Sequence, residues 1–427
     1  MRGEDAFADE AFVAAFCAER GIPLHAARVD VRAQAKERRI GEEQAGREAR
    51  YALFEQAAAV AHFADAVACA GQEPPAAPVV ATAHTASDQA ETLLLNLLRG
   101  SGLEGLAGIP PARPGFVRPL LEVTRAEVED YCRRHGLDYV TDSTNLEDRY
   151  RRNRIRHHLL PQLEAEYNPN LTRTLCRTAS LLREEAALLD ALVDDLPAAR
   201  SFAGLLLLPT APLKAVAPAL ARRHLRRELQ RQLGVTLSLP QAERLAELAL
   251  GGAGRCQPGG GLMAHHSCGV LAVMRRDWQP PSYHLSVDRE GLYPLFFFGA
   301  LRVSRQTGKE IGKNSGKGAT IHRLSCGIIL DALSLRPPRQ GERCRLVRRR
   351  EAPLAHLMAE AGIPAFLRPL MPVVECGGEI VALAPLGPAE EATAADGEDA
   401  LVLEWLPDAA IAPFLGLPDG AADGGTK

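Results

Sequence analysis

The sequence predicts an α/β chain in which a domain with a parallel sheet is followed by a helical domain and by two smaller, strand-rich domains. Residues 1–165 alternate short apolar runs with longer amphipathic segments, which is typical of parallel strands connected by helices. Residues 170–250 are rich in Leu, Ala, Glu and Arg with helical periodicity. From residue 255 onward, short β-type runs are separated by glycine-rich turns. The 427 residues, 46% of them hydrophobic, are enough for roughly two to four domains with cores of their own.

The first domain contains the strand and helix units of such a sheet. A buried strand is expected at 78–82, where an apolar run ends in Thr82, and a helix is expected to follow at 86–98. Thr124 and Glu127 have the spacing of a capping box, which predicts a helix that runs to His135. Further strands are expected at 29–31 and 138–141, and a long helix at 42–67.

The later segments are expected to differ in architecture. Residues 170–250 should form a helical domain, and 255–335 a β-rich segment. Residues 336–405 should form a small α+β domain, and 415–427, rich in Gly, Asp and Ala, a disordered tail. The elements expected within them are strands at 269–274, 283–287 and 295–303, a mobile loop at 307–318, a helix at 354–361, and strands near 371–375 and 379–383.

Polar residues follow the expected strand at 78–82. His84, Asp88 and Glu91 are spaced i, i+4 and i+7, so they share one face of the following helix. Ligands of α/β folds bind at this end of the strands, and two carboxylates there suit an amine, a Mg²⁺ ion or a ribose. The alternative is that both acids only stabilise the helix, through their interaction with the positive N-terminal end of the helix dipole, at about 0.3–1 kcal/mol each. Arg99 then begins a loop with four glycines, which indicates close backbone approach.

A second group of candidate residues is rich in arginine. Arg152 and Arg156 are four residues apart on a short helix, and Asn153 and His157 share the neighbouring face. Guanidinium groups in such a row match the geometry of phosphate oxygens. An ordinary solvated basic face is the alternative.

Composition limits the class of protein. The net charge of −3 argues against a uniformly basic nucleic-acid binder, but arginines cluster at 149–156, 222–231 and 343–350, as expected for contacts along an RNA backbone. For 222–231, an amphipathic surface helix is an equal alternative. The chain has no apolar run of membrane-spanning length and no signal-peptide pattern, and its nine cysteines lack C-x-x-C spacing, which predicts a soluble cytoplasmic protein. No metal is expected, because Cys256, His265, His266 and Cys268 do not have zinc-ligand spacing.

Five motifs together resemble one known family. In this order and spacing, they resemble the bacterial tRNA(Ile)-lysidine synthases of the PP-loop ATP pyrophosphatase group, closely over residues 1–180. Near the C-terminus, Arg336-Pro-Pro-Arg-Gln-Gly-Glu-Arg343 and the segment 362–372 look like the terminal domain of that family. The five motifs are His84-xxx-Asp88-xx-Glu91-Thr92, Arg99-Gly-Ser-Gly-Leu-xx-Leu, Arg118-Pro-Leu-Leu121, Asp142-Ser-Thr-Asn145 and Arg152-Asn-xx-Arg-His-xx-Leu-Pro161.

The resemblance implies a Rossmann-like, PP-loop sheet domain and a two-step ligation that uses ATP and Mg²⁺. ATP would adenylate C2 of the wobble cytidine in a tRNA(Ile) with a CAU anticodon, and the ε-amine of free lysine would displace AMP to form lysidine. The implied catalytic residues are Asp88, Glu91, Arg152 and Arg156, with both acids as candidates for the lysine amines and both arginines for phosphate charge.

Further roles are implied for other residues. Arg50 is the candidate for the lysine carboxylate or the α-phosphate, although pairing with Glu43 or Glu48 is an equal alternative. The helical domain and the C-terminal domain are expected to bind tRNA, and a homodimer is a further expectation. The implied substrate-binding residues also include His84, Arg99 and Asn153, and the implied tRNA-binding residues are Arg343, Arg345, Arg348, Arg349 and Arg350.

One departure from the family pattern concerns the phosphate loop. The family binds ATP with an N-terminal Ser-Gly-Gly-x-Asp-Ser loop, and this sequence does not occur in the chain. We therefore expect an N-terminally truncated domain, through a misassigned start codon or a degenerate gene copy, and no tRNA-dependent pyrophosphate release from residues 1–427 alone. Two alternatives follow: a tRNA-binding remnant without catalysis, or a different PP-loop tRNA-modifying enzyme. The second would normally use paired cysteines, whereas Cys69 and Cys132 are isolated.

Overall fold

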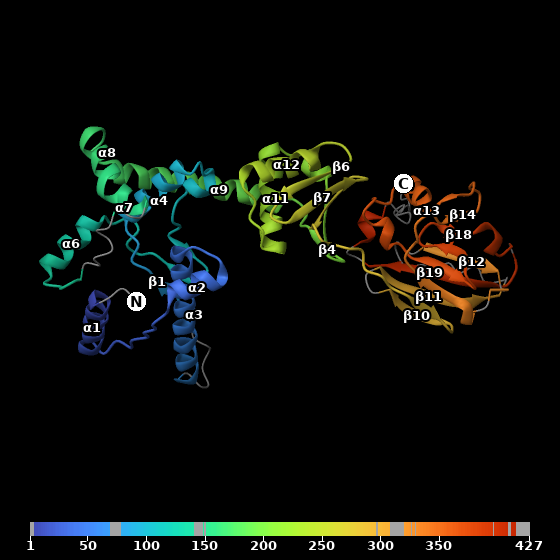
Figure 1. The fold of residues 1–427 in the computed structure, drawn as a ribbon, viewed down its shortest axis with the longest axis horizontal. Helices are drawn as coiled ribbons and strands as arrows, with labels where there is room; N and C mark the ends of the chain where they lie inside the picture. The colour runs from blue at the N-terminus through green and yellow to red at the C-terminus, as the bar shows by residue number, and fades with distance from the viewer. Residues whose placement is uncertain are drawn as a thin grey trace, which may run out of the picture. The chain divides into compact units, whose positions relative to one another are not determined.

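A computed structural model shows a chain of two compact units, residues 1–190 and 191–427 (Figure 1). The structure describes residues 4–68, 78–140, 148, 151–295, 298–307, 320–325, 327–328, 330–395, 397–408 and 411–415. Both helices and sheets are present, which confirms the α/β fold class. None of the described helices combines the length and apolar character that crossing a membrane requires.

The first unit places helices around a small sheet. Strand β1 pairs in parallel with β3, with Val80 opposite Phe116, and β2 pairs antiparallel with β3. Parallel pairing among the described strands of this unit is thus limited to one pair. The elements are α1 (Glu4–Glu19), α2 (Val31–Arg38), α3 (Glu42–Ala68), β1 (Val80–Ala81), α4 (Ala86–Leu98), α5 (Leu103–Leu106), β2 (Ala112–Arg113), β3 (Phe116–Val117), α6 (Arg125–Arg134), α7 (Arg151–Arg154), a π-helical turn (Ile155–Leu159), α8 (Leu160–Glu166) and α9 (Leu171–Asp194).

The locally encoded helices of this unit are confirmed, and two expected strands are wrong. α3, α4 and α6 begin where the sequence predicts, and Thr124 and Glu127 form the expected capping box. The strand expected at 29–31 is wrong because the Asp30 side chain accepts a hydrogen bond from the backbone N–H of Ala33 at 3.0 Å and starts α2. The strand expected at 138–141 is also not found, because no described strand pairs with 138–140; residue 141 and the motif at 142–145 lie outside the described residues.

The second unit begins with a five-stranded sheet in the order β4-β5-β8-β7-β6, packed against α11 and α12. The helical segment expected at 170–250 is therefore interrupted by two strands. The reason is that the leucines of β5 alternate between two cores: Leu206 and Leu208 face α11 and α12, whereas Leu205 and Leu207 face the core of the C-terminal part. The elements are β4 (Arg200–Phe202), β5 (Leu205–Pro209), α10 (Ala211–Lys214), α11 (Pro218–Leu233), α12 (Leu239–Leu250), β6 (Gly254–Gly259), β7 (Leu262–Ser267) and β8 (Val270–Arg275).

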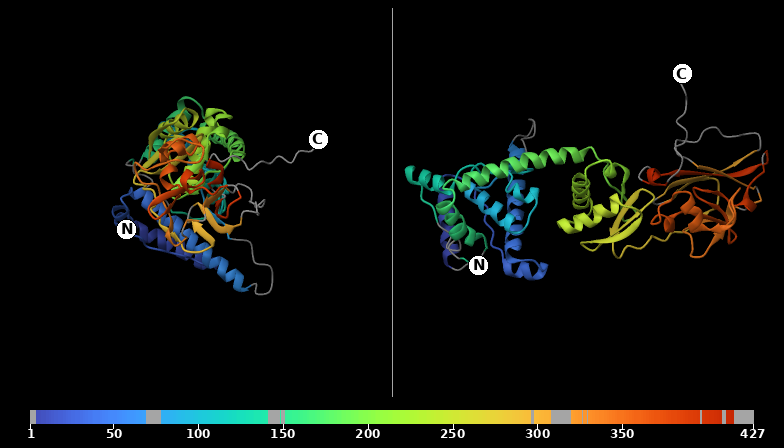
Figure 2. Two further views of the ribbon diagram at one scale, coloured as in Figure 1. Left: turned by 90° about the vertical axis from the view of Figure 1, so that its right-hand side faces the viewer. Right: turned by 90° about the horizontal axis from the view of Figure 1, so that it is seen from above.

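The C-terminal part of this unit contains a five-stranded sheet, a four-stranded sheet and a short hairpin. Figure 2 shows this part in orange and red. The sheet orders are β18-β17-β16-β13-β9 and β10-β11-β19-β12, and Trp405 of β19 is fully buried in the core between them. The elements are β9 (Leu285–Val287), β10 (Gly291–Leu295), β11 (Gly299–Gln306), β12 (Thr320–Ser325), β13 (Leu333–Arg336), β14 (Arg343–Cys344), β15 (Ala352–Pro353), α13 (Leu354–Glu360), β16 (Val373–Cys376), β17 (Glu379–Leu383), β18 (Gly387–Pro388) and β19 (Ala400–Pro407).

The predictions for this part hold where local pattern is strong. The helix at 354–361 and the strands at 269–274, 283–287, 371–375 and 379–383 correspond to elements of the structure. The segment expected as one strand at 295–303 is divided between β10 and β11, and β6, β7, β12 and β19 are not among the predicted strands. Most of the loop expected at 307–318 and all of 416–427 lie outside the described residues.

Candidate functional site

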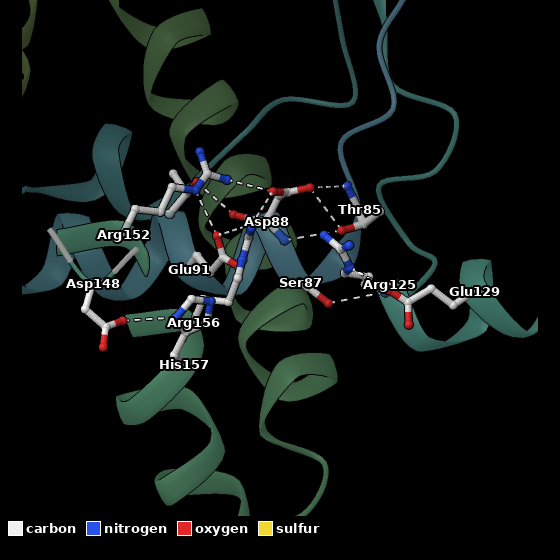
Figure 3. Close-up of polar contacts among 11 residues, drawn as sticks. Thr85, Ser87, Asp88, Glu91, Arg125, Glu129, Asp148, Arg152, Arg156 and His157 are labelled. Atoms are coloured by element: carbon white, nitrogen blue, oxygen red, sulfur yellow. Dashed lines mark hydrogen bonds and ion pairs between the residues drawn. The ribbon is translucent and has the colours of Figure 1, made fainter. Parts of the chain in front are cut away.

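The start of α4 fixes the first candidate acid. The backbone N–H of Thr85 donates to Oδ2 of Asp88 at 2.9 Å, and the backbone N–H of Asp88 donates to Oγ1 of Thr85 at 3.4 Å (Figure 3). This reciprocal cap holds one carboxylate oxygen of Asp88 at the helix start, directly after β1. The other oxygen is left to face partners from elsewhere in the chain.

Two arginines from α7 and the π-helical turn meet the two acids of α4 (Figure 3). Arg152 donates through Nε to Oε2 of Glu91 at 2.8 Å and through Nη2 to Oδ1 of Asp88 at 2.8 Å. Arg156 donates through Nε to Oε1 of Glu91 at 2.6 Å and through Nη2 to Oδ1 of Asp88 at 3.3 Å. The four predicted catalytic residues therefore form one network of two carboxylates and two guanidinium groups.

Burial differs across this network. The Glu91 side chain is 1% exposed and the Asp88 side chain 20%, whereas those of Arg152 and Arg156 are 37% and 23% exposed. Burial alone would lower the pKa of Arg156, but its hydrogen bonds and charge interaction with Glu91 outweigh that effect and raise the pKa. Glu91 is thus a buried counter-charge for both arginines, and Asp88 is the more accessible acid.

The π-helical turn Ile155–Leu159 separates α7 from α8, and its wider winding joins Leu160 N–H to the carbonyl of Ile155. The buried Ile155 side chain packs against Ala90 and Leu94 of α4. This contact holds the arginine-bearing segment against the helix that carries the acids. Asn153, between the two arginines in sequence, is also buried.

A cavity of about 610 Å³ lies beside this network. Asp88 and Arg152 line it, whereas Glu91 and Arg156 do not. His84 also lines it, and its Nδ1 shares a hydrogen bond of 3.0 Å with Oγ1 of Thr82. The pKa of His84 is lowered, chiefly by burial and further by nearby arginines, against an opposing effect of Asp88, so the imidazole is neutral at pH 7. The lining residues are Arg47, Arg50, Tyr51, Phe54, Ala81, Thr82, Ala83, His84, Asp88 and Arg152.

The other predicted substrate-binding arginines have different positions. Arg50 lines the cavity, and Glu48, one of its expected alternative partners, pairs with Arg38 at 3.1 Å instead. Arg99 is exposed at the opposite end of α4 from Asp88, and the structure does not bring it to the cavity. Arg47, Tyr51 and Phe54 are not among the predicted site residues, although their spacing with Arg50 on one predicted helix is a usable signal.

The glycine-rich loop after Arg99 makes the expected close approach at one position. Gly108 has φ +65°, and a Cβ there would lie 2.7 Å from Oε1 of Gln89. The buried Gln89 side chain accepts from the backbone N–H of Ile109 at 2.6 Å, and Arg183 donates to the carbonyl of Ala107 at 3.0 Å. The loop is therefore held against α4 and α9.

The predicted tRNA-binding arginines lie on and around the β14–β15 hairpin, and all five are exposed. Arg343 pairs with Glu351 at 2.9 Å, Arg349 with Glu360 at 3.4 Å, and Arg345 with Glu390. Arg348 and Arg350 have no ion-pair partner among the described residues. Exposed surface pairs of this kind are weak, so these arginines are available to an anionic partner.

Residues of the other arginine cluster and of the cysteine–histidine group make contacts within the second unit. On α11, Leu225 and Leu229 are buried and Arg231 pairs with Glu228 at 3.1 Å, which supports the amphipathic-helix alternative for 222–231. His266 contacts the carbonyl of Leu248 through Nδ1 at 3.0 Å. Among the described residues, no three His, Cys, Asp or Glu side chains are grouped so as to hold a metal ion.

Comparison with known proteins identifies the family. Residues 2–163, which contain the network and the cavity, match a family described as a PP-loop domain, and residues 333–405 match the TilS substrate C-terminal domain. A tRNA(Ile)-lysidine synthase of Azoarcus sp. (strain BH72) is 36% identical over 352 residues, which cover 77% of this chain and 70% of that protein. The chain belongs to the tRNA(Ile)-lysidine synthase family.

Two further comparisons describe the extent of this similarity. The tRNA(Ile)-lysidine synthase of Solibacter usitatus (strain Ellin6076) is 40% identical over 260 residues, which cover 60% of this chain and 54% of that protein. The chain thus spans about half the length of that relative. A crystal structure of a TILS C-terminal domain aligns with 30% of this chain and 98% of that chain, at 21% identity and a TM-score of 0.26.

Proposed function

We propose that this chain takes part in the reaction named for its family, the ATP-dependent ligation of lysine to C2 of the wobble cytidine in a tRNA(Ile) with a CAU anticodon. The observation that supports this most directly is the network of Asp88, Glu91, Arg152 and Arg156 at the edge of a cavity lined by Arg50 and His84. It combines one accessible carboxylate for an amine with several guanidinium groups for phosphate or carboxylate oxygens. These charges are complementary to those of a cationic amino acid and of an adenylated intermediate.

The two acids have different proposed roles. Asp88 lines the cavity and binds an amine of lysine, since its Oδ1 faces cations already. Glu91 is buried, and both of its carboxylate oxygens accept from guanidinium groups, so it positions Arg152 and Arg156 instead of contacting lysine. For the amine to reach Asp88, Arg152 and Arg156 must both give up their contacts with Oδ1, and an anionic phosphate in the cavity is then the natural partner for Arg152.

The proposed chemistry has two steps. The C2 carbonyl oxygen of cytidine attacks the α-phosphorus of ATP and pyrophosphate leaves; the ε-amine of lysine then attacks C2 and AMP leaves. Arg152, which lines the cavity, stabilises the phosphate charge, as preorganised cations do in phosphoryl transfer, and Arg156 adds positive charge from behind it in the same network. Arg50 binds the lysine carboxylate or the α-phosphate. The lowered pKa of His84 favours its neutral form, and the imidazole lies at the cavity, where it accepts a proton from the attacking amine.

The use of ATP and Mg²⁺ in this reaction is also part of the proposal. The Ser-Gly-Gly-x-Asp-Ser loop of the family does not occur in the sequence, so the β- and γ-phosphates are not assigned to residues of this chain. The two acids do not suit Mg²⁺, because their oxygens already accept hydrogen bonds from Arg152, Arg156 and Thr85. No step is assigned to the metal ion.

We further propose that the hairpin arginines Arg343, Arg345 and Arg348–Arg350 bind the tRNA backbone, because they are exposed and lie within the segment that matches the TilS substrate C-terminal domain. A cytoplasmic location and a homodimer stay predictions. Arg99 stays a candidate only for contacts outside the cavity.

The test uses the protein expressed from the complete gene, with any in-frame coding sequence upstream of Met1 included, together with tRNA(Ile) transcript, ATP and labelled lysine. We expect tRNA-dependent pyrophosphate release and lysine that stays bound to the RNA, with the mass of lysidine in its nuclease digest. RNA binding without pyrophosphate release would support a tRNA-binding remnant. A different modified nucleoside in the digest would assign the chain to another PP-loop activity and overturn the proposal.

A further inference from the structure

Tyr51 on α3 lines the cavity and has two arginines beside its ring. The guanidinium carbon of Arg113, on β2, lies 4.6 Å from the centroid of the Tyr51 ring and 4.3 Å from that of Phe116. The guanidinium carbon of Arg47 lies 5.3 Å from the Tyr51 centroid. Tyr51 itself packs against Phe116 with ring centroids 5.2 Å apart. We call Arg47, Tyr51 and Arg113 the arginine–tyrosine platform.

The platform is positively charged and open to solvent. Arg47 and Arg113 are exposed, and so is the neighbouring cavity residue Arg50. None of the three has a carboxylate partner among the described residues, in contrast to Arg152 and Arg156, which are neutralised by Asp88 and Glu91. Their contacts with aromatic rings hold the guanidinium groups of Arg47 and Arg113 in place, and the N–H groups of both remain available to an RNA phosphate.

We propose that the arginine–tyrosine platform binds the unpaired nucleotides of the tRNA anticodon loop next to the cytidine that enters the cavity. This inference rests on the proposed function and names the surface by which the RNA substrate reaches the site. Unpaired bases stack on guanidinium planes and aromatic rings, and the free N–H groups donate to the flanking phosphates. A continuous strand explains the open, exposed position of the platform better than a single nucleotide, because small ligands are mostly enclosed by their sites.

The experiment measures binding of a fluorescent RNA hairpin, the anticodon stem and loop with a CAU anticodon, to the full-length gene product without ATP or lysine. A 2-aminopurine in place of the anticodon adenine reports stacking. We expect R47A and R113A each to weaken binding by about tenfold or more, the effect of removing one hydrogen bond between charged groups, and to reduce the change in 2-aminopurine fluorescence. The slope of log affinity against log salt should fall by up to about one for each phosphate that the variant no longer neutralises.

The matched control is R32A. Arg32 is an exposed arginine on the adjacent helix α2, its pair with Glu42 is 3.7 Å long, and it lies outside the cavity lining. R32A should bind the hairpin as the wild type does. R47K and R113K separate stacking from charge: they should keep the salt slope but lose the fluorescence change, because an ammonium group is not planar.

Three outcomes would overturn the inference. Wild-type affinity in R47A and R113A would remove the platform from the RNA surface. If R47A and R113A lose as much affinity for a hairpin with abasic loop positions, the platform does not stack on bases and acts only through general charge attraction. Weaker ATP binding with unchanged hairpin binding would assign the platform to the nucleotide. If the hairpin results hold but the full-length protein forms no lysidine, the proposed function fails and the platform stands.

Discussion

Glu91 offers the sharpest test of the network, because its carboxylate accepts from both Arg152 and Arg156 while its side chain is only 1% exposed. The substitution Glu91→Gln keeps the shape but leaves two guanidinium groups facing Asp88 alone. Breaking a buried pair by removing one partner typically costs about 3–5 kcal/mol. Since Arg152 can turn toward solvent, we expect the lower end, about 3 kcal/mol.

The measurement is thermal unfolding of the full-length protein followed by far-UV circular dichroism and by tryptophan fluorescence. Both tryptophans, Trp278 and Trp405, lie in the second unit, so the fluorescence transition should not move. The transition of the first unit, seen by circular dichroism, should fall by about 6–12 °C, since 1 kcal/mol shifts a domain of this size by about 2–4 °C.

The control is Glu129→Gln, which breaks the surface pair between Arg125 and Glu129, 2.7 Å apart in the folded chain. An exposed pair of this kind contributes below about 1 kcal/mol. Replacing Arg156 by Met in the Glu91→Gln background should recover part of the loss, because it removes one of the uncompensated charges. If Glu91→Gln destabilises the protein no more than Glu129→Gln, the buried counter-charge role of Glu91 is wrong.

Three further predictions concern substrate, RNA and pH. Asp88→Asn should raise the KM for lysine strongly, at about 2–5 kcal/mol for a broken charge pair, while tRNA-dependent exchange of pyrophosphate into ATP is largely retained; unchanged lysine kinetics would remove Asp88 from the lysine site. Replacing Arg348–Arg350 with alanine should weaken tRNA binding and lower its salt slope without changing the KM for lysine, and an unaltered slope would make the cluster an ordinary surface. Burial lowers the pKa of His322 from 6.5 to about 4, so the folded state is favoured by the full contribution of the neutral imidazole above pH 6.5. This contribution to the free energy of unfolding, about 3 kcal/mol, is lost as the pH falls toward 4. In H322L, urea unfolding followed by fluorescence should depend less on pH across this window; an identical pH profile would exclude His322 as the cause.

Local signals in the sequence are sufficient for the helices that carry the site. A capping box needs only residues three apart, so Thr124 with Glu127 predicts the start of α6, and Thr85 with Asp88 is the same kind of local signal at the start of α4. The four-residue spacing of Arg152 and Arg156 likewise directs both side chains toward one side of their helix. The same motifs, in their order, are sufficient to recognise the family.

Local pattern fails where a segment's partner lies far away in sequence. The run Leu205–Leu208 suits a helix or a strand by composition, and it is a strand because β8 pairs with it and both of its faces are covered. The apolar segment at 29–31 has strand-like residues, yet no described strand lies beside it and Asp30 caps a helix there. A hydrophobic pattern predicts that a segment is buried, but the segment that pairs with it decides whether it forms a helix or a strand.

The candidate site shows the same division. The sequence by itself determined which side chains are acids and guanidinium groups and which helix faces they share. Only the tertiary structure decided that Glu91 is buried beneath arginines 61 and 65 residues further along the chain, that Asp88 remains at the cavity, and that Tyr51 of α3 lies beside Arg113 of β2. The physical reason is that burial and charge pairing depend on which segments the hydrophobic core brings together, and no local spacing specifies that.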